Sequence, residues 1–116
     1  MNRWLDVISI DHIDPDTGAC ALVDGTQVAL VRVGEGDTVY AIANRDPFSG
    51  AYVLSRGIVG DATGAPKIAS PMYKHSFDLR TGVCLDDPSV RLPTWPVRVR
   101  RGRVEILLEA SLHAAA

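Results

Sequence analysis

The sequence has 116 residues, a length that fits one compact domain with a hydrophobic core of its own. Hydrophobic residues make up 47% of the chain and charged residues 22%, a balance that argues against intrinsic disorder. The formal net charge of -2 gives the protein no general attraction to nucleic acid or to an anionic membrane surface.

The N-terminal third consists of short apolar runs separated by Gly and Asp, a pattern typical of antiparallel β structure. Asp24 and Gly25 suit a tight hairpin turn, because both residues can take positive φ. These strands would form a meander. We expect them over residues 4–8, 19–23, 27–33 and 38–43.

Residues from about 44 to 82 form a looser stretch that is rich in turn-forming pairs. Asp-Pro, Ser-Gly and Thr-Gly-Ala-Pro all interrupt regular structure. We therefore expect a loop-rich insert here, which keeps only short strands at residues 58–59 and 67–69.

The C-terminal part returns to strands after residues 83–85 and a connection marked by two prolines. A hairpin of residues 97–100 and 103–108 is predicted around Arg101-Gly102, with one core face and one basic face. Residues 109–116 are rich in Ala and predict a short helical tail. The chain, residues 1–116, is thus predicted to be a single all-β domain, an antiparallel sandwich or partly open barrel.

The segment Ser70-Pro-Met-Tyr-Lys-His-Ser-Phe-Asp-Leu-Arg-Thr-Gly82 has the frame of an iron-sulfur binding loop. It resembles the second ligand loop of Rieske domains, where a Cys-x-x-His pair precedes a Phe-Asp-Leu-x-Thr-Gly turn. Ser70 and Tyr73 stand at the Cys and His positions. The first ligand loop, Cys-x-His, aligns with Asn44-Arg45-Asp46, so Asn44 and Asp46 occupy its ligand positions.

A Rieske centre needs two thiolates on one iron and two imidazoles on the other. Asn, Asp, Ser and Tyr do not supply the soft sulfur donors that iron-sulfur clusters select. The four vacant ligand positions predict a Rieske-like fold with no cofactor and no metal in this chain. One alternative is a Rieske-type [2Fe-2S] electron-transfer protein with an unconventional site. Another is a free-standing enzyme that uses Asp46, Tyr73 or His75.

Further motifs lie around and beyond the ligand positions, and they are Val39-Tyr-Ala-Ile-Ala-Asn44, Asp46-Pro-Phe-Ser-Gly50, Leu54-Ser-Arg-Gly-Ile-Val-Gly-Asp61 and Trp95-Pro-Val-Arg-Val99. Together they resemble the small subunit of assimilatory NAD(P)H-dependent nitrite reductase, from Trp4 to about Ile106. The resemblance implies a cofactor-free subunit beside a large subunit that holds FAD, an iron-sulfur cluster and siroheme. The complex of that family reduces nitrite to ammonium in nitrate assimilation.

The resemblance also implies a docking surface, because the cluster end of electron-transfer Rieske proteins contacts their redox partners. Aromatic residues and Met are enriched in interface cores, which favours the same end of this chain as the contact with the large subunit. Core packing is the alternative role for each residue. The candidate partner contacts are Phe48, Tyr52, Arg56, Met72, Tyr73 and His75.

Three of the singled-out residues have a structural interpretation as well. Asp46 before Pro47 favours turn formation over metal binding, because Asp accepts hydrogen bonds from the backbone two residues on. The ring of Tyr73 is expected to fill the volume that a cluster would occupy. Arg56 would bind a carboxylate of the partner or would pin its own loop to Asp46 or Asp61.

The remaining reactive and charged residues predict no separate site. Cys20 and Cys84 are expected to be buried, inert thiols. The arginines at 98, 100, 101 and 103 predict a solvated strand face, since no aromatic residues alternate with them as a nucleic-acid platform requires. The N-terminal sequence shows no signal peptide or membrane span, which predicts a cytoplasmic protein.

Overall fold

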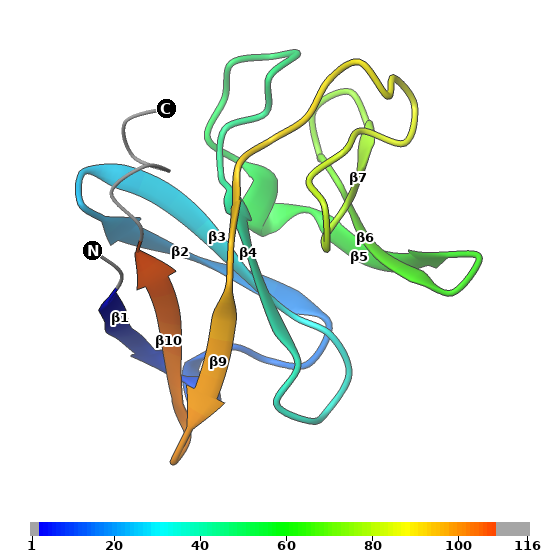
Figure 1. Ribbon diagram of the computed structural model, residues 1–116. Helices are drawn as coiled ribbons and strands as arrows, with labels where there is room; N and C mark the ends of the chain where they lie inside the picture. The colour runs from blue at the N-terminus through cyan, green and yellow to red at the C-terminus, as the bar shows by residue number, and fades with distance from the viewer. Residues whose placement is uncertain (1–2, 109–116) are drawn as a thin grey trace.

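The computed structural model describes residues 3–108, and its ten strands form three antiparallel sheets (Figure 1). The first sheet has the order β1 (Arg3–Ser9), β10 (Arg103–Leu108) and β9 (Val97–Arg100). The second has the order β2 (Thr17–Val23), β3 (Thr26–Arg32), β4 (Val39–Ala43) and β8 (Thr94–Trp95). The third consists of β5 (Ile58–Ala62), β6 (Ala65–Ala69) and β7 (Ser76–Asp78).

This architecture confirms the all-β prediction, and the sheets do not close into a barrel. Within residues 3–108 the helical segments are two single turns, η1 (Ile10–His12) and η2 (Leu54–Arg56). Neither turn has the length or the apolar character of a helix that crosses a membrane. The helical tail expected over residues 109–116 lies outside the described residues.

The second sheet is the middle layer of the protein, because its strands contribute to two separate hydrophobic cores. Along β3, Val28 and Leu30 face the first core, whereas Ala29 and Val31 face the second. This assignment follows from the two-residue period of a strand, which sends successive side chains to opposite faces of the sheet. A run of four consecutive buried residues in β3 is the sequence signature of this position.

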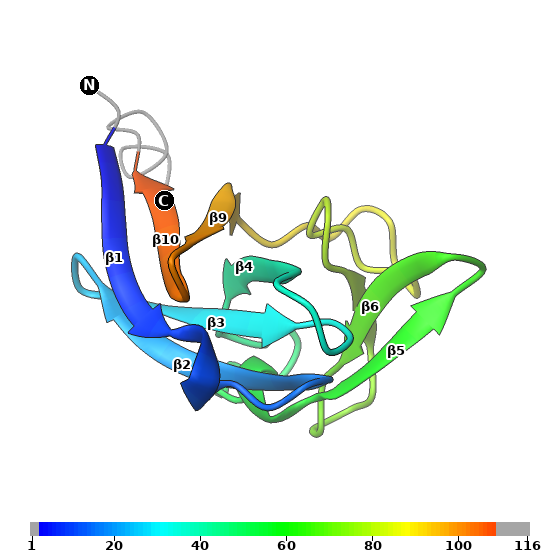
Figure 2. The ribbon, with the colours of Figure 1, turned by 90° about the horizontal axis from the view of Figure 1, so that it is seen from below.

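The first core lies between the middle sheet and the sheet of β1, β9 and β10. The second core lies between the middle sheet and the lobe built on β5, β6 and β7, which extends from the side opposite β1 (Figure 2). The first core contains Ile10, Ile13, Val23, Val28, Leu30, Val39, Ala41, Trp95, Val104, Ile106 and Leu108. The second contains Ala29, Val31, Ile42, Leu54, Ile68, Phe77, Leu79, Cys84 and Leu92.

Three hairpins turn through pairs of residues that both have positive φ, namely Asp24-Gly25, Thr63-Gly64 and Arg101-Gly102. Asp24 and Gly25 do so between β2 and β3, as predicted, with φ of 48° and 80°. The pair Thr63 and Gly64 does the same between β5 and β6, with φ of 50° and 89°. This hairpin extends the strands expected at 58–59 and 67–69 to Ile58–Ala62 and Ala65–Ala69, because the tight turn pairs every residue between them.

The remaining segments add pairings that the sequence did not predict. Residues 83–85 form isolated bridges, Phe77 with Cys84 and Val83 with Arg91. Two short strands, β7 (Ser76–Asp78) and β8 (Thr94–Trp95), were not predicted. They are too short to show periodicity, and pairing with β6 and β4 defines them.

The basic face of the C-terminal hairpin is partly neutralised rather than simply solvated. Arg98 binds Glu105 on the neighbouring strand, and its guanidinium carbon lies 4.2 Å from the centre of the Trp4 ring. Arg103 binds Asp6 of β1 at 2.9 Å. These pairs tie β9, β10 and β1 together across the face that the sequence predicted to be basic.

The backbone turn at Gly82 is predicted to be among the least substitutable positions. Its φ is +81°, and a Cβ atom there would lie 2.1 Å from the carbonyl oxygen of Leu92. Gly82→Ala therefore combines left-handed strain with a steric clash and should cost about 3 kcal/mol of unfolding free energy. Gly64→Ala is the matched control, because Gly64 has a φ of +89° with nothing within 4 Å of the added carbon. Urea denaturation should show a loss of about 1 kcal/mol for this control, and equal losses would contradict the role of the Leu92 contact.

Candidate functional site

Three loops meet at the end of the molecule opposite the β9–β10 turn, at the top of Figure 1. They are residues 44–53, 70–75 and 85–93, and the first two carry the four vacant ligand positions. The Ser76 amide, at the end of the second loop, donates to the Asp86 carboxylate in the third, at 2.7 Å. This hydrogen bond connects the second loop to the third.

A single polar contact joins the first two loops. The Ser70 hydroxyl donates to the Asp46 carboxylate at 2.5 Å, and both residues are buried. The other carboxylate oxygen of Asp46 accepts from the Phe48 amide at 2.8 Å and from the Ser49 amide at 3.4 Å. Asp46 therefore closes its own loop and fastens the second loop to it.

The environment of Asp46 holds its side chain in the ionised form. Burial alone would raise the pKa of the Asp46 carboxyl. Hydrogen bonds from the Ser70 hydroxyl and from the Phe48 and Ser49 amides outweigh burial, and they hold this pKa below its ordinary value. A buried carboxylate with three hydrogen-bond donors is an adequately compensated charge.

Asn44 points away from the space between the loops. Its side-chain oxygen accepts from the Ser55 amide at 2.7 Å, and its side-chain nitrogen donates to Gln27 at 3.0 Å. The same nitrogen lies 3.5 Å from the sulfur of Cys20. Asn44 thus anchors the first loop to η2 and to the middle sheet.

The two cysteines lie in different surroundings. Cys84 is buried in the second core, as expected, but Cys20 is exposed on β2. The expectation that both thiols are buried is therefore wrong for Cys20. Partial desolvation raises the pKa of the Cys20 thiol, so the thiolate needed for a reactive cysteine is disfavoured.

Tyr73 does not fill the volume between the loops, contrary to the expectation from sequence. Its side chain is 63% exposed, and the neighbouring Met72 is 47% exposed. The side chains of Asp46 and Ser70 meet between the loops instead. Lys74, with a φ of 63°, turns the backbone directly after Tyr73.

Phe48 of the first loop and His75 of the second loop pack on each other. Their rings are nearly parallel, at an interplanar angle of 10°, and the ring centres lie 3.8 Å apart. Phe77 extends this aromatic layer at 6.4 Å from Phe48 and lies in the second core. The imidazole Nδ1 is buried and has no hydrogen-bond partner among the described residues. Phe48 and His75 are half-buried, so they support the loops more than they present a surface.

The residues present do not fit a [2Fe-2S] cluster at this end. Asn44 is turned toward the middle sheet, Asp46 and Ser70 bind each other, and Tyr73 faces outward. None of the four supplies a thiolate or an imidazole. Within residues 3–108, no three His, Cys, Asp or Glu side chains gather in a group that could hold a metal ion.

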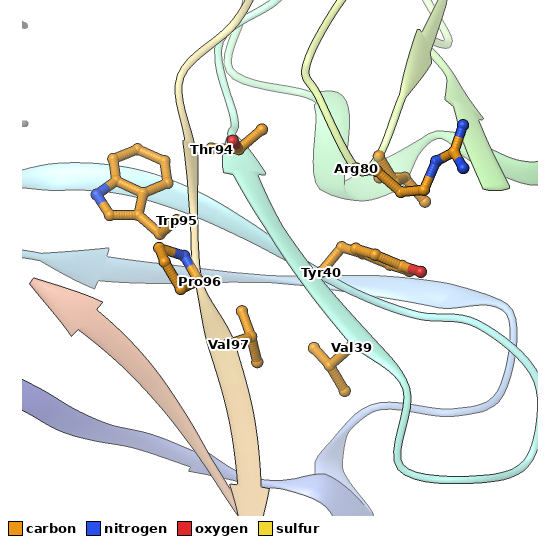
Figure 3. Close-up of a pocket in the computed structure, with 8 residues that line it drawn as sticks. Val39, Tyr40, Arg80, Thr94, Trp95, Pro96 and Val97 are labelled. Carbon is orange, nitrogen blue, oxygen red and sulfur yellow. The ribbon is translucent and has the colours of Figure 1, made fainter. Parts of the chain in front are cut away.

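The structure also contains two surface hollows that the sequence did not predict. One has a volume of about 340 Å³, and Tyr40, Arg80, Trp95 and Val97 are among its lining residues (Figure 3). Its only charged lining residue, Arg80, binds the Asp78 carboxylate through two nitrogens, at 3.3 and 3.1 Å. The second hollow has a volume of about 310 Å³ and lies beside the first loop. It is lined by Leu22, Gly25, Thr26, Gln27, Ala43, Arg45 and Tyr52.

Arg56, the remaining candidate contact, is exposed at the end of η2. Within residues 3–108 it forms no ion pair with Asp46 or Asp61. Its neighbour Ser55 is buried and held by Asn44. The loop is thus fixed through the backbone amide of Ser55 rather than through the Arg56 guanidinium.

Comparisons of the sequence and of the structure with known proteins point to the same family. Residues 3–107 match the family described as a Rieske-like [2Fe-2S] domain. The nitrite reductase (NADH) small subunit of Escherichia coli K12 is 41% identical over 106 residues, which cover 91% of this chain and 98% of that protein. A crystal structure assigned as an NADH-dependent nitrite reductase small subunit from Mycobacterium tuberculosis has a TM-score of 0.88 at 46% identity. The alignment covers 95% of this chain and 98% of that one.

A nitrite reductase [NAD(P)H] large subunit from Klebsiella oxytoca also matches. It contains a region that is 42% identical to this chain over 101 residues. The region covers 87% of this chain but only 10% of that protein. A domain of this kind is therefore part of the same polypeptide as a large subunit in that organism.

The bond between Ser70 and Asp46 is predicted to stabilise the fold measurably. Ser70→Ala removes a buried donor to a carboxylate and should cost about 1.5–3 kcal/mol of unfolding free energy in urea denaturation. Ser89→Ala is the matched control, since its hydroxyl donates to Asp87 at 2.6 Å in an exposed position. The control should change stability by less than about 0.5 kcal/mol, and a similar loss in both variants would contradict a special role for the buried bond.

Asp46 should also leave a pH signature. Because its folded-state pKa lies below the unfolded-state value of about 3.9, its contribution to stability is complete above that value. The contribution is lost as the pH falls through the folded-state pKa. Thermal melts from pH 7 to pH 3 should therefore show the stability gap between wild type and Asp46→Asn narrowing toward the acid end. A gap that widens on acidification would show that the pKa of Asp46 is raised instead.

Proposed function

This chain belongs to the family of NAD(P)H-dependent nitrite reductase small subunits, and we propose that it acts as the cofactor-free subunit of such an enzyme. In this proposal, residues 1–116 form one Rieske-like domain that works in the cytoplasm beside a large subunit. The complex reduces nitrite to ammonium with NADH or NADPH. The FAD, iron-sulfur cluster and siroheme that the resemblance implies belong to the large subunit.

The observation that carries this proposal is similarity over the whole length of small subunits. The match to the Escherichia coli protein covers 98% of that protein, so no extra domain of the relative is missing from the comparison. The large subunit of Klebsiella oxytoca supports the same partner, because it holds a similar region within its own chain. Where such a domain is a separate chain, as here, we expect it to bind the large subunit of its own organism.

The chemistry of the loop end supports a structural rather than a redox contribution. Electron transfer through this end would need thiolate and imidazole ligands, and the four aligned positions hold Asn44, Asp46, Ser70 and Tyr73. The Asp46 carboxylate accepts the Ser70 hydroxyl where a cluster would otherwise join the loops. We infer that the subunit assembles or stabilises the large subunit and carries no electrons itself.

The proposed contacts with the large subunit are of two kinds. Tyr52, Met72 and Tyr73 are exposed, and their apolar surface would be buried on binding. Phe48 and His75 support these loops from beneath through their stacked rings. Arg56 is exposed and free to bind a carboxylate of the partner.

Co-expression of this chain with the large subunit from the same organism tests the proposal. We expect the two chains to co-purify and nitrite-dependent NAD(P)H oxidation to fall, or to decay faster, when this chain is omitted. The isolated chain should hold no stoichiometric iron or acid-labile sulfide and should not reduce nitrite. Failure to co-purify, with no change in rate, would contradict the subunit role. Iron and sulfide in equal stoichiometric amounts would favour the electron carrier instead.

A further inference from the structure

The hollow beside the first loop is lined by two large, exposed hydrophobic side chains. Leu22, at the end of β2, is 73% exposed, and Tyr52 of the first loop is 55% exposed. Arg45 and Tyr52 are paired by an isolated antiparallel backbone bridge, which places the two residues opposite each other at the base of the first loop. Ala43 and the β2–β3 turn complete the lining. Large exposed apolar side chains that line a hollow are a feature of anchor sites for a partner side chain.

Arg45 is the one charged residue that lines this hollow. Within residues 3–108 it forms no ion pair. The neighbouring carboxylates are already engaged, since Asp46 binds Ser70 in the interior and Asp24 lies 3.7 Å from Arg3. The hollow thus combines an unpaired positive charge with the exposed apolar side chains of Leu22 and Tyr52.

The Arg45 guanidinium lies close to the first loop at Gly50, where an added Cβ atom would be 3.4 Å from Arg45 Nη2. The Asp46 amide donates to the Ala51 carbonyl at 2.8 Å, which closes this loop. A planar guanidinium presents paired donors that match the two oxygens of a carboxylate.

The second loop is fastened to the first by the buried bond between Asp46 and Ser70. Met72 and Tyr73 follow Ser70 directly and are exposed. Lys74 is exposed as well and forms no ion pair within residues 3–108. The acidic residues Asp86 and Asp87 lie in the third loop, where they accept hydrogen bonds from Ser76 and Ser89. The first two loops therefore form a surface that is apolar and positively charged.

We propose that this hollow binds an acidic segment of the nitrite reductase large subunit. A carboxylate of that segment pairs with Arg45, and an adjacent apolar side chain lies between Leu22 and Tyr52. Charge complementarity selects the carboxylate, because Arg45 offers a planar pair of donors that matches it. The inference rests on the proposed function, and it takes its partner from the large subunit of Klebsiella oxytoca, which carries a similar domain in its own chain.

The test measures binding of the full-length chain to the purified large subunit by biolayer interferometry. Arg45→Glu and Leu22→Asp should each raise the Kd about tenfold or more, because each places a negative charge against the acidic segment. Arg100→Glu is the control, since Arg100 is exposed on β9 toward the opposite end of the molecule (Figure 1). The control should leave the Kd within about twofold.

Salt dependence separates the charge pair from a general loss of contact. Raising the ionic strength should weaken binding of the wild type, and Arg45→Glu should remove most of this dependence. Circular dichroism melts should show that both hollow variants fold as the wild type does, since Arg45 and Leu22 are exposed. Tyr52→Ala provides a third variant that truncates the other exposed apolar side chain and keeps the backbone bridge.

The outcomes distinguish this inference from the proposed function. If the wild type and all three hollow variants bind the large subunit equally well, the hollow is not the binding site. The proposed subunit role is then unaffected. If the wild type does not bind the large subunit at all, both are overturned. If the isolated chain dimerises and Arg45→Glu abolishes the dimer, the occupant is a second copy of the chain, and the proposal of an acidic large-subunit segment is overturned.

Discussion

Two loops that leave different strands are held together by one hydrogen bond between buried groups, from the Ser70 hydroxyl to the Asp46 carboxylate. In a Rieske centre the cluster joins the equivalent loops through four ligand bonds. Here the carboxylate takes over the joining role, because it accepts from the second loop with one oxygen and from its own loop with the other. The stacked rings of Phe48 and His75 form a second contact between the same two loops.

The loops are positioned in turn by the middle sheet. Asn44 leaves β4 at the point where the first loop begins, and its side chain binds both Gln27 of β3 and the backbone of η2. The strand before it contributes Ala41 to one core and Ile42 to the other, so it is fixed from both faces. A loop that starts from a strand packed in two cores has a defined direction, and the hydrogen bonds of Asn44 extend that order into the loop.

The sequence predicts the parts of this structure that local rules control. The Asp24-Gly25 hairpin and the strands Val97–Arg100 and Arg103–Leu108 follow from turn chemistry and alternation. The Thr63-Gly64 hairpin was missed because the same residues also suit an irregular loop. Tyr73 was misplaced because alignment to a ligand position does not show that the side chains of Asp46 and Ser70 meet between the loops. The Arg45 hollow needs Leu22 and Tyr52 from distant segments, and no local pattern joins them.

The two hollows differ in the pairing of their arginine and in the apolar area that they expose, and both differences affect how well each could recognise a partner. In the hollow of Figure 3 the guanidinium of Arg80 is already paired with Asp78, so a second carboxylate would have to compete for it. Trp95 in the same hollow is mostly buried in the first core and offers little new area to cover. Arg45 has no such competitor within residues 3–108, and Leu22 and Tyr52 still expose most of their apolar surface. Burial of that surface and pairing of that charge are both still available to a partner, which makes the loop end the favoured interface.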